Sequence, residues 1–331
     1  MIKYFLGTDS AVLVSIFGIA FAFLLTALAL SKWTGFLPRD LGRDFAFNGK
    51  KSQGKPRGAG ILFVSIFFVA SLLFARLQTD AGISIEIISY LVLIMLAMLS
   101  GYLDDRSNKP WSEYLKGFLD LLIAVSVAVT YLYANDNTVY LLVVGKDLEI
   151  NKWVFGALIV LLVWVSINVT NCTDGVDGLS GTLSVITLSC IYLIDYLNQS
   201  TDLFSYLNLL FVACLMAYLW FNASPSRLMM GDAGSRAMGL MIAISVLKSG
   251  SAFLYIPIAL VLILDGGLGL LKVSLLRFLK IKILKNIRTP LHDHFRKNKG
   301  WSDTQVVMRF SIIQIAICAA VICFLVWSKQ R

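Results

Sequence analysis

Hydrophobic residues gather along this chain into long runs, and short polar segments separate the runs. A helix of about 20 apolar residues can cross the hydrocarbon core of a bilayer, because it satisfies its own backbone hydrogen bonds where water is absent. The pattern predicts ten membrane-spanning helices, at residues 11–31, 59–75, 83–103, 113–134, 153–170, 180–197, 203–221, 232–247, 252–271 and 305–327.

The composition supports this interpretation. Hydrophobic residues make up 58% of the 331 positions and charged residues only 15%, whereas an ordinary soluble domain has about 25% charged residues. We therefore predict an all-α integral membrane protein with a single polytopic domain over residues 1–331. The first run is long enough to stay in the protein as an anchor, and no cleaved signal peptide is expected before it.

Lysine and arginine residues indicate on which side of the membrane each loop lies, because short cytoplasmic loops are enriched in them. Of the 29 basic residues, 22 fall in alternate loops, at 32–58, 104–112 with Lys116, 168–179, 222–236, and 272–304 with Arg309. We expect these loops to be cytoplasmic and both termini to be extracytoplasmic. The acidic motifs described below all fall on the predicted cytoplasmic side, which predicts a single active site there.

The net charge of +9 does not indicate a nucleic-acid partner. The basic residues flank membrane spans, so we expect anionic membrane lipid as the partner and no nucleic acid. Residues 272–285 interleave basic and apolar positions, a pattern typical of a helix that lies at the lipid headgroups. The alternative is an extension of the ninth span into water.

Asp104 and Asp105 end the third apolar run. Carboxylates are costly at a membrane boundary unless they bind something, and a magnesium ion commonly takes one or two carboxylates together with substrate phosphates. The pair is therefore a candidate site for metal or phosphate. The alternative is a hydrated helix end at which the carboxylates pair with Arg106.

A second acidic segment lies between the fifth and sixth runs. Asp174 and Asp177 would share one face if the segment were helical, and Gly175 would let a bulky ligand approach the backbone. The alternative is a turn in which the aspartates cap the sixth span. Asn168 and Asn171 extend the polar run beyond what a cap requires, which favours a functional site.

Asp232 stands at the start of the eighth run, where the exposed amides of a helix favour an anion such as pyrophosphate. Its carboxylate could hold a metal that bridges to the anion, although the same residue could serve only as a helix cap. Asn222, at the end of the seventh run, is a candidate hydrogen-bonding partner for a substrate.

The chain has two histidines, His292 and His294, and both lie on the predicted cytoplasmic side. No cysteine or second histidine pair is near enough in sequence to complete a tetrahedral zinc set. Phosphate contact or proton transfer suits the histidines better. The alternative is that they stabilise the local loop.

Two segments resemble a known family of membrane enzymes. Residues 171–179 resemble an Asn-x-Thr-Asp-Gly-x-Asp-Gly-Leu pattern, and residues 290–310 are similar to Pro-x-His-His-His-Phe followed by Gly-Trp-Ser-x-Thr-x-Val-Val-x-Arg-Phe. Both patterns are typical of the polyprenyl-phosphate N-acetylhexosamine-1-phosphate transferases, in the branch that handles the N-acetylmuramoyl-pentapeptide (MurNAc-pentapeptide). The resemblance covers nearly the whole chain.

The resemblance implies an enzyme of peptidoglycan biosynthesis in the bacterial plasma membrane. Such an enzyme transfers phospho-MurNAc-pentapeptide from UDP-MurNAc-pentapeptide to undecaprenyl phosphate, giving lipid I and UMP, with Mg²⁺ as cofactor. The implied catalytic residues are Asp104, Asp105, Asp232 and His292, with Asp232 as the metal ligand. The resemblance implies nucleoside-side or structural positions at Asn171, Asp174, Gly175 and Asp177, and a substrate-site asparagine at Asn222. We also predict that His294 and Lys51 bind substrate.

Three departures from the family pattern affect this assignment. Asp293 replaces the middle histidine of the signature, so that histidine's substrate contact does not carry over. Residues 54–60 place Lys55 and Arg57 where the usual Gly-Thr-Pro-Thr-Met-Gly-Gly has threonines. Residues 228–230 lack the aromatic residue often found before Gly-Asp, which leaves the uracil-stacking partner open.

Two other functions remain open from the sequence. A sister transferase that uses UDP-GlcNAc or a related sugar is compatible with Asp293 and the altered glycine loop. An ion-coupled transporter would place a carboxylate within a span, and Asp265 in the ninth run is the main candidate. The sequence does not fix the oligomeric state, for which a homodimer is one arrangement.

Overall fold

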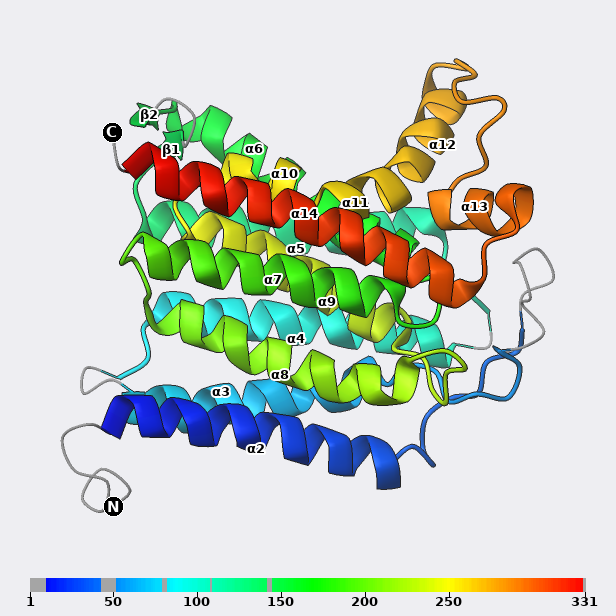
Figure 1. Cartoon of the computed structure of the whole chain (residues 1–331), viewed down its shortest axis with the longest axis horizontal. Helices are drawn as coiled ribbons and strands as arrows, with labels where there is room; N and C mark the ends of the chain where they lie inside the picture. Colours follow the sequence, from blue (N-terminus) through cyan, green and yellow to red (C-terminus); the bar gives the residue numbers. More distant parts are fainter. Residues whose placement is uncertain (1–9, 43–51, 79–81, 108, 142–144, 330–331) are drawn as a thin grey trace.

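The computed structural model describes residues 10–42, 52–78, 82–107, 109–141 and 145–329, and most of them are helical (Figure 1). The principal helices are α2 (Ser10–Lys32), α3 (Gly60–Gln78), α4 (Ile85–Arg106), α5 (Glu113–Ala134), α6 (Lys152–Thr173), α7 (Leu179–Leu197), α8 (Leu203–Asn222), α9 (Gly231–Lys248), α10 (Tyr255–Ile258), α11 (Leu260–Leu262), α12 (Leu268–Phe278), α13 (Leu291–Lys299) and α14 (Asp303–Lys329). Within these ranges the one sheet is an antiparallel hairpin of β1 (Thr138–Leu141) and β2 (Lys146–Glu149).

Polar side chains fix where several helices begin. Ser84 and Ser112 accept hydrogen bonds from the third backbone N–H of α4 and α5, at 3.3 and 3.2 Å. Asn151 accepts from the second N–H of α6 at 3.0 Å, and Asp202 forms a reciprocal capping box with Ser205 at the start of α8. These caps satisfy amide groups that the first helical turn leaves without partners.

The membrane-protein class predicted from the sequence is confirmed. Among the described residues, the helices long and apolar enough to cross a membrane are α2, α4, α5, α6, α7, α8 and α14. The segment from α10 to α12 adds one more if its two parts, which meet at 69°, form one span. Each predicted span coincides with a helix or with this bent segment, but the ten-span count and the placement of the termini stay predictions.

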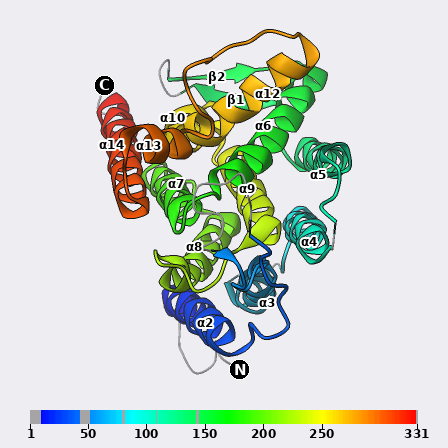
Figure 2. The same cartoon turned by 90° about the vertical axis from the view of Figure 1, so that its right-hand side faces the viewer.

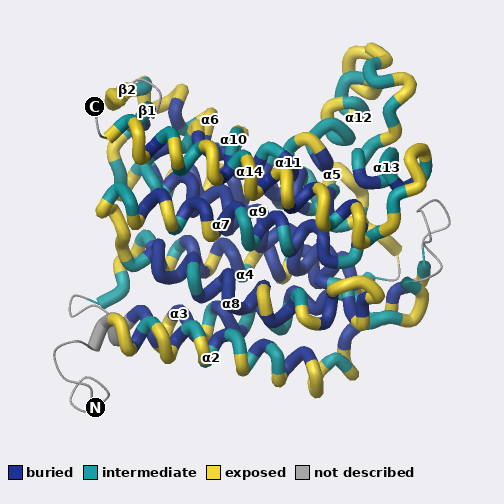
Figure 3. Tube along the Cα trace, in the orientation of Figure 1, coloured by how far each residue is buried: buried dark blue, intermediate teal, exposed yellow. Residues whose placement is uncertain are grey.

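Helix α9 lies at the centre of the bundle and packs against α3, α4, α6, α7 and α8 (Figure 2). Every residue from Gly231 to Leu247 is buried, as the dark-blue trace shows (Figure 3). A side chain at Gly239 would collide with the backbone of α6, so the glycine permits the close approach of the two helices. Because α9 faces protein on all sides, it can carry charged residues that lipid would exclude.

The ninth predicted span is broken inside the bundle. A π-helical turn, η3 (Ile263–Gly267), separates α11 from α12, and α12 then diverges from the other helices (Figure 1). The 69° bend of the segment lies ahead of this turn, between Ile258 and Leu260. A side chain at Gly266 would meet the carbonyl oxygen of Val169 on α6, so this glycine lets η3 pack closely against α6. The turn buries Asp265 completely. Turns of this kind interrupt helices frequently at functional sites.

The two ends of the bundle differ in chemistry. The C-terminal ends of α4 and α6, the N-terminal end of α9, and α13 lie together at the right of Figure 1. The β1–β2 hairpin lies at the opposite end. The predicted acidic motifs and both histidines therefore occupy one end of the molecule, as a single site requires.

Candidate active site

Three carboxylates converge where α4 ends and α9 begins. Asp104 and Asp105 come from the last turn of α4, and Asp232 from the first turn of α9. The Lys116 ammonium, from the start of α5, pairs with Asp104 and stands 3.1 Å from Asp232. All three carboxylates are almost fully buried, so the cation stabilises charges that would otherwise lack solvation.

Asp105 is held from two sides. Its Oδ1 lies 2.9 Å from Nε of Arg57, and its Oδ2 accepts a hydrogen bond from the backbone N–H of Ala233 at 3.1 Å. Gly231 has φ of 68°, and a side chain there would collide with this carboxylate. The glycine therefore supplies both the left-handed backbone and the space that Asp105 occupies.

Arg57 reaches the cluster from the glycine-rich loop. Backbone hydrogen bonds join this loop to the segment before α9, from Ala59 N to Met229 O at 3.0 Å and from Met229 N to Pro56 O at 2.8 Å. Burial lowers the pKa of Arg57, but the nearby carboxylates, chiefly those of Asp105 and Asp232, raise it further, and the net pKa lies above its ordinary value. The guanidinium is therefore charged at any working pH.

A second set of polar residues supports Asp232. Asn171 donates through Nδ2 to Asp232 at 3.1 Å and to the Ser235 hydroxyl at 2.9 Å. Arg236, one turn along α9, pairs with the buried Asp120 of α5 at 3.0 Å and stands 3.9 Å from Asp232. Asp232 is thus bound by side chains and not used as the cap of α9, whose N-cap residue is Met230.

The cluster carries more negative than positive charge. It contains five buried carboxylates and three cations, which leaves two negative charges, and its members are Asp40, Asp104, Asp105, Asp120, Asp232, Arg57, Lys116 and Arg236. The described residues contain no group of three or more His, Cys, Asp or Glu side chains arranged for a metal. Mg²⁺ commonly takes only one or two carboxylates, and its charge matches the excess, so the donor set around Asp232 fits this ion.

His292 is hydrogen-bonded to Asp265, the buried carboxylate of the ninth predicted span. Asp265 accepts the His292 backbone N–H at 2.7 Å through Oδ1, and its Oδ2 lies 2.7 Å from the ring nitrogen Nδ1. The other ring nitrogen, Nε2, faces Gly175, where any side chain would collide with it. Asp265 therefore orients the imidazole, and Nε2 is the nitrogen aimed at the acidic turn after α6.

The carboxylate cluster and the His292–Asp265 pair adjoin the same turn of α6. Asn171, in the last turn of α6, donates a hydrogen bond to Asp232. Gly175, in the turn that follows directly, faces Nε2 of His292. The last turn of α6 thus connects the predicted metal ligand with the predicted histidine.

Several predicted substrate-binding residues have structural partners. Asp174 is the C-cap residue of α6, and Asp177 accepts the Ser226 backbone N–H at 3.0 Å. These aspartates lie in a turn, so they do not share a helical face. Asn222 accepts from Gly178 N at 2.8 Å and donates to Leu228 O at 2.9 Å, which fastens that turn to the segment before α9.

Of the two remaining predicted substrate-binding residues, His294 and Lys51, the structure describes only His294. His294 accepts a hydrogen bond from the Arg288 backbone N–H at 3.3 Å through Nδ1, and this bond stabilises the loop before α13. Lys51 lies outside the described residues. Neither Asp104 nor Asp105 has an ion pair with Arg106 among the described contacts, since their partners are Lys116 and Arg57.

Sequence reasoning missed four residues of this site. Arg57 and Lys55 were noted only as departures from a pattern, yet Arg57 contacts Asp105, and Lys55 stands 3.8 Å from Asp177. Lys116 was counted only as a loop charge, and Asp265 was not connected with the histidine. A signal for Lys55 and Arg57 is present in the sequence: both are cations in a glycine-rich turn on the same predicted side as the acidic motifs.

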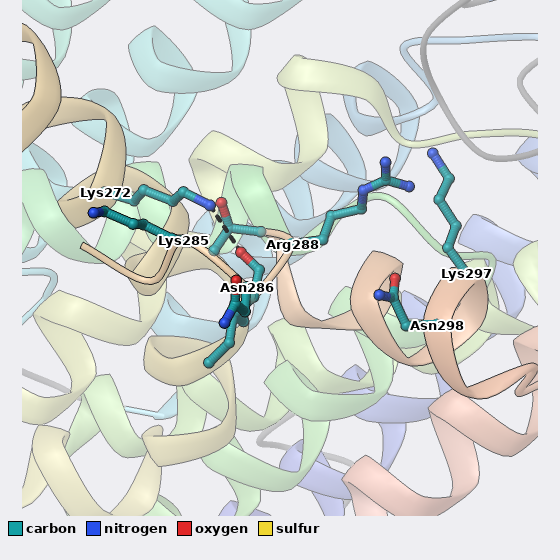
Figure 4. A pocket seen from close by; sticks show the side chains of 8 residues that line it. Lys272, Lys285, Asn286, Arg288, Lys297 and Asn298 are labelled. Atoms are coloured by element: carbon teal, nitrogen blue, oxygen red, sulfur yellow. Dashed lines mark hydrogen bonds between the residues drawn. The ribbon is translucent and has the colours of Figure 1, made fainter. Parts of the chain in front are cut away.

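A basic pocket of about 570 Å³ adjoins α13 (Figure 4). Its charged lining comes from Lys272, Lys285, Arg288 and Lys297. Lys272 donates to the backbone oxygens of Leu284 and Ile287 at 3.1 and 2.8 Å, so it also fixes the loop after α12. Arg288 and Lys297 extend toward the same side of the pocket in this view. The pocket presents positive charge at the end of the bundle that carries the acidic cluster.

A buried carboxylate cluster and an oriented histidine thus lie together at one end of an apolar helical bundle, as expected for a membrane enzyme. Residues 87–250 match the glycosyl transferase family 4. The chain is 42% identical to the phospho-N-acetylmuramoyl-pentapeptide-transferase of Treponema pallidum, over 84% of this chain and 80% of the relative. It is 30% identical to the protein of that name from Dictyoglomus turgidum, over 89% and 92% of the two chains.

A third relative of the same name, from a Nitratiruptor species, is 28% identical over 80% of this chain and 79% of its own length. The chain belongs to the phospho-N-acetylmuramoyl-pentapeptide-transferase family. The resemblance inferred from residues 171–179 and 290–310 is therefore confirmed.

Proposed function

We propose that this protein transfers phospho-MurNAc-pentapeptide from UDP-MurNAc-pentapeptide to undecaprenyl phosphate, forming lipid I and UMP in peptidoglycan biosynthesis. The observation that carries the proposal is the convergence of Asp104, Asp105 and Asp232 on Lys116 and Arg57 in a member of this family. An oxygen of the lipid phosphate attacks the phosphorus linked to the sugar, and the bond from that phosphorus to the UMP oxygen breaks.

The cations and the carboxylates of the cluster have different roles in the proposed reaction. The positive charges of Lys116 and Arg57 reduce the repulsion between two phosphate-bearing substrates. A phosphate can reach both side chains, because 24% and 21% of their surfaces are exposed to solvent. Asp232, positioned by Asn171, is the proposed ligand of Mg²⁺. When bound, Mg²⁺ supplies neutralisation of phosphate charge and stabilisation of the UMP leaving group.

His292 acts on the nucleotide-sugar side of the site in this proposal. Asp265 fixes the ring so that Nε2 points at the turn containing Gly175, where this nitrogen can accept a proton or a hydrogen bond from a bound substrate. The glycine leaves room for the ligand close to the backbone. Asp174 and Asp177 then shape that turn, and Asn222 fastens it in place.

We place the enzyme in the bacterial plasma membrane with this site at the cytoplasmic face. The charge bias of the loops supports that orientation, and the apolar helices support a multi-pass protein. A site at the membrane edge lets a water-soluble nucleotide sugar meet a phosphate whose polyprenyl tail stays in hydrocarbon.

The test uses purified protein in detergent with undecaprenyl phosphate and either UDP-MurNAc-pentapeptide or UDP-GlcNAc. We expect UMP release with the first nucleotide sugar. Release only with UDP-GlcNAc would make the protein a sister transferase, the alternative that Asp293 and the loop at residues 54–60 keep open.

The site assignment is tested separately by the variants Asp232→Asn and His292→Ala, assayed over a range of Mg²⁺ concentrations. We expect both to lose most of the UMP release, with Asp232→Asn requiring more metal for what remains. Full activity in either variant would remove that residue from the proposed chemistry.

A further inference from the structure

The Arg57 guanidinium lies close to carboxylates from three separate segments of the chain. Its Nε lies 2.9 Å from Asp105, and its terminal nitrogens lie 3.8 Å from Asp40 and 3.7 Å from Asp232. Only the first of these contacts is as short as a hydrogen bond. The guanidinium is therefore anchored through Nε, while its two terminal nitrogens are loosely placed beside the predicted metal ligand.

The three cations of the cluster are not equivalent. The Arg236 side chain is only 4% exposed and is committed to Asp120, and Lys116 binds both Asp104 and Asp232 closely. Arg57 is exposed to a similar extent as Lys116, at 21% and 24% of the side chain, but its terminal nitrogens lie 3.7–3.8 Å from their described carboxylate partners, so they are held less closely. A guanidinium also presents two parallel N–H donors that match two oxygens of one phosphate, which an ammonium cannot do.

We propose that Arg57 is a further catalytic residue, which exchanges a carboxylate partner for the transferring phosphate when the nucleotide sugar binds. In the free protein its terminal nitrogens cover Asp232 and Asp40. In the complex they bind two non-bridging oxygens of the sugar-linked phosphate, while Nε stays on Asp105. This proposal rests on the proposed transferase function and adds to it a specific phosphate contact.

The exchange has a consequence for metal binding. A guanidinium 3.7 Å from Asp232 Oδ1 competes with a divalent cation for the same carboxylate. When the guanidinium binds the phosphate instead, the Asp232 carboxylate becomes more available to the divalent cation. Binding of the metal and of the nucleotide sugar is therefore cooperative, and by thermodynamic reciprocity each increases the affinity for the other. Removing the guanidinium weakens this coupling.

The backbone around Arg57 is fixed without its side chain. Its own N–H donates to Pro38 O at 2.8 Å, and Pro56 O on one side and Ala59 N on the other bind Met229. The family pattern has threonine at this position, so a threonine is compatible with the loop. The variant Arg57→Thr should therefore fold, and it removes the guanidinium without removing the segment that carries it.

The experiment compares the whole protein with Arg57→Thr, Arg57→Lys and the control Arg39→Ala. Arg39 lies in the same loop region with an exposed side chain, whose one described hydrogen bond is to Gly54 O at 3.3 Å, so its loss removes the same charge away from the cluster. Mn²⁺ binding to substrate-free protein is measured by electron paramagnetic resonance. UMP release is measured with both substrates at varied metal concentration.

We expect Arg57→Thr to bind Mn²⁺ several-fold more tightly without substrate and to lose about 10²-fold in kcat/KM for the nucleotide sugar, the scale for removal of a phosphate-stabilising donor. Arg57→Lys should keep Mn²⁺ affinity near that of the unmodified protein, yet lose activity because it lacks the paired donors. Arg39→Ala should change neither quantity.

An unchanged Mn²⁺ affinity in Arg57→Thr, or an unchanged kcat/KM, would overturn the proposal. A parallel loss of activity, metal affinity and thermal stability would also overturn it, since that result describes a merely structural residue. If the unmodified protein released no UMP from UDP-MurNAc-pentapeptide, the proposed function would fail instead, and the Mn²⁺ comparison would still report whether Arg57 covers Asp232.

Discussion

Asp265 binds His292 twice, through the backbone N–H and through ring nitrogen Nδ1, both at 2.7 Å. The two residues are 27 positions apart, and the π-helical turn of the ninth predicted span brings them together. A carboxylate in this position fixes the direction of the ring and favours the proton on Nδ1. The active nitrogen is then Nε2, which faces Gly175.

The first prediction follows from this orientation. Asp265→Asn keeps the size of the side chain but offers the ring an amide, so the imidazole can adopt the wrong tautomer. We expect kcat to fall on the order of 10²–10⁴-fold, as for other histidines that lose an orienting carboxylate. The measurement is UMP release across a pH series, in which the profile should also change shape.

The matched control is Asp147→Asn in the exposed hairpin at the far end of the bundle, which should leave the pH profile unchanged. If Asp265→Asn kept both its rate and its profile, the carboxylate would have no part in positioning His292.

The second prediction concerns the glycine beside Asp105. Gly231→Ala would place a methyl group on this carboxylate and would also strain a backbone with φ of 68°. We expect a loss of stability of about 1–3 kcal/mol together with loss of activity. Thermal unfolding in detergent, followed by intrinsic fluorescence, measures the first effect.

Gly117→Ala provides a control with the opposite sign. No atom lies within 4 Å of the added methyl group, and the residue is inside α5, so alanine should be neutral or stabilise by about 0.5–1 kcal/mol. Equal behaviour of the two variants would show that the space beside Asp105 is not restricted.

The sequence was sufficient to predict the general arrangement of the acidic site. The lengths of the apolar runs predicted where helices lie, and the loop charges predicted that residues 104, 105 and 232 share one side. The structure places these three carboxylates around Lys116 and Arg57. This agreement follows because span length and loop order together determine which helix ends lie on the same side of the bundle.

The partners within the site could not be predicted in the same way. The pairing of Asp265 with His292 depends on a helix break that periodicity does not reveal, because the run at 252–271 is continuously apolar apart from Asp265 and its glycines. Asn222 stays a predicted substrate contact, and the structure adds that it joins two loops, which the sequence does not indicate. A polar residue near a site can bind either a ligand or the backbone, and sequence alone does not distinguish them.

The third prediction compares a buried ion pair with an exposed one. Asp120→Ala would leave the Arg236 guanidinium, 4% exposed, without its carboxylate partner at 3.0 Å. We expect a loss of about 3–5 kcal/mol, because the buried guanidinium would keep only the more distant Asp232 carboxylate, at 3.9 Å, as a described partner. Chemical or thermal unfolding of the purified protein measures it.

Glu113→Ala removes the partner of Arg277 in an exposed pair at 2.7 Å, and its unfolding should be indistinguishable from that of the unmodified protein. If Asp120→Ala lowered the free energy of unfolding as little as Glu113→Ala does, solvent or lipid headgroups would have to reach Arg236.

The fourth prediction concerns the basic pocket beside α13, whose positive charge we expect to steer anionic substrates toward the site. Lys285→Ala combined with Arg288→Ala removes two of its positive charges. We expect kcat/KM for the nucleotide sugar to fall several-fold at low ionic strength, with kcat unchanged, because a longer-range field accelerates encounter. The difference should shrink at about 0.15 M salt, where the screening length is about 8 Å.

A control pair, Lys146→Ala with Lys152→Ala, removes the same charge near the hairpin at the opposite end of the bundle. Steering predicts no effect there, because that end does not face the substrates. If the pocket variant showed the same salt dependence as the unmodified protein, the positive charge would serve another purpose, such as holding α12 and α13 together. A separate thermal unfolding measurement would show that outcome as a lower unfolding temperature without any change in kcat/KM.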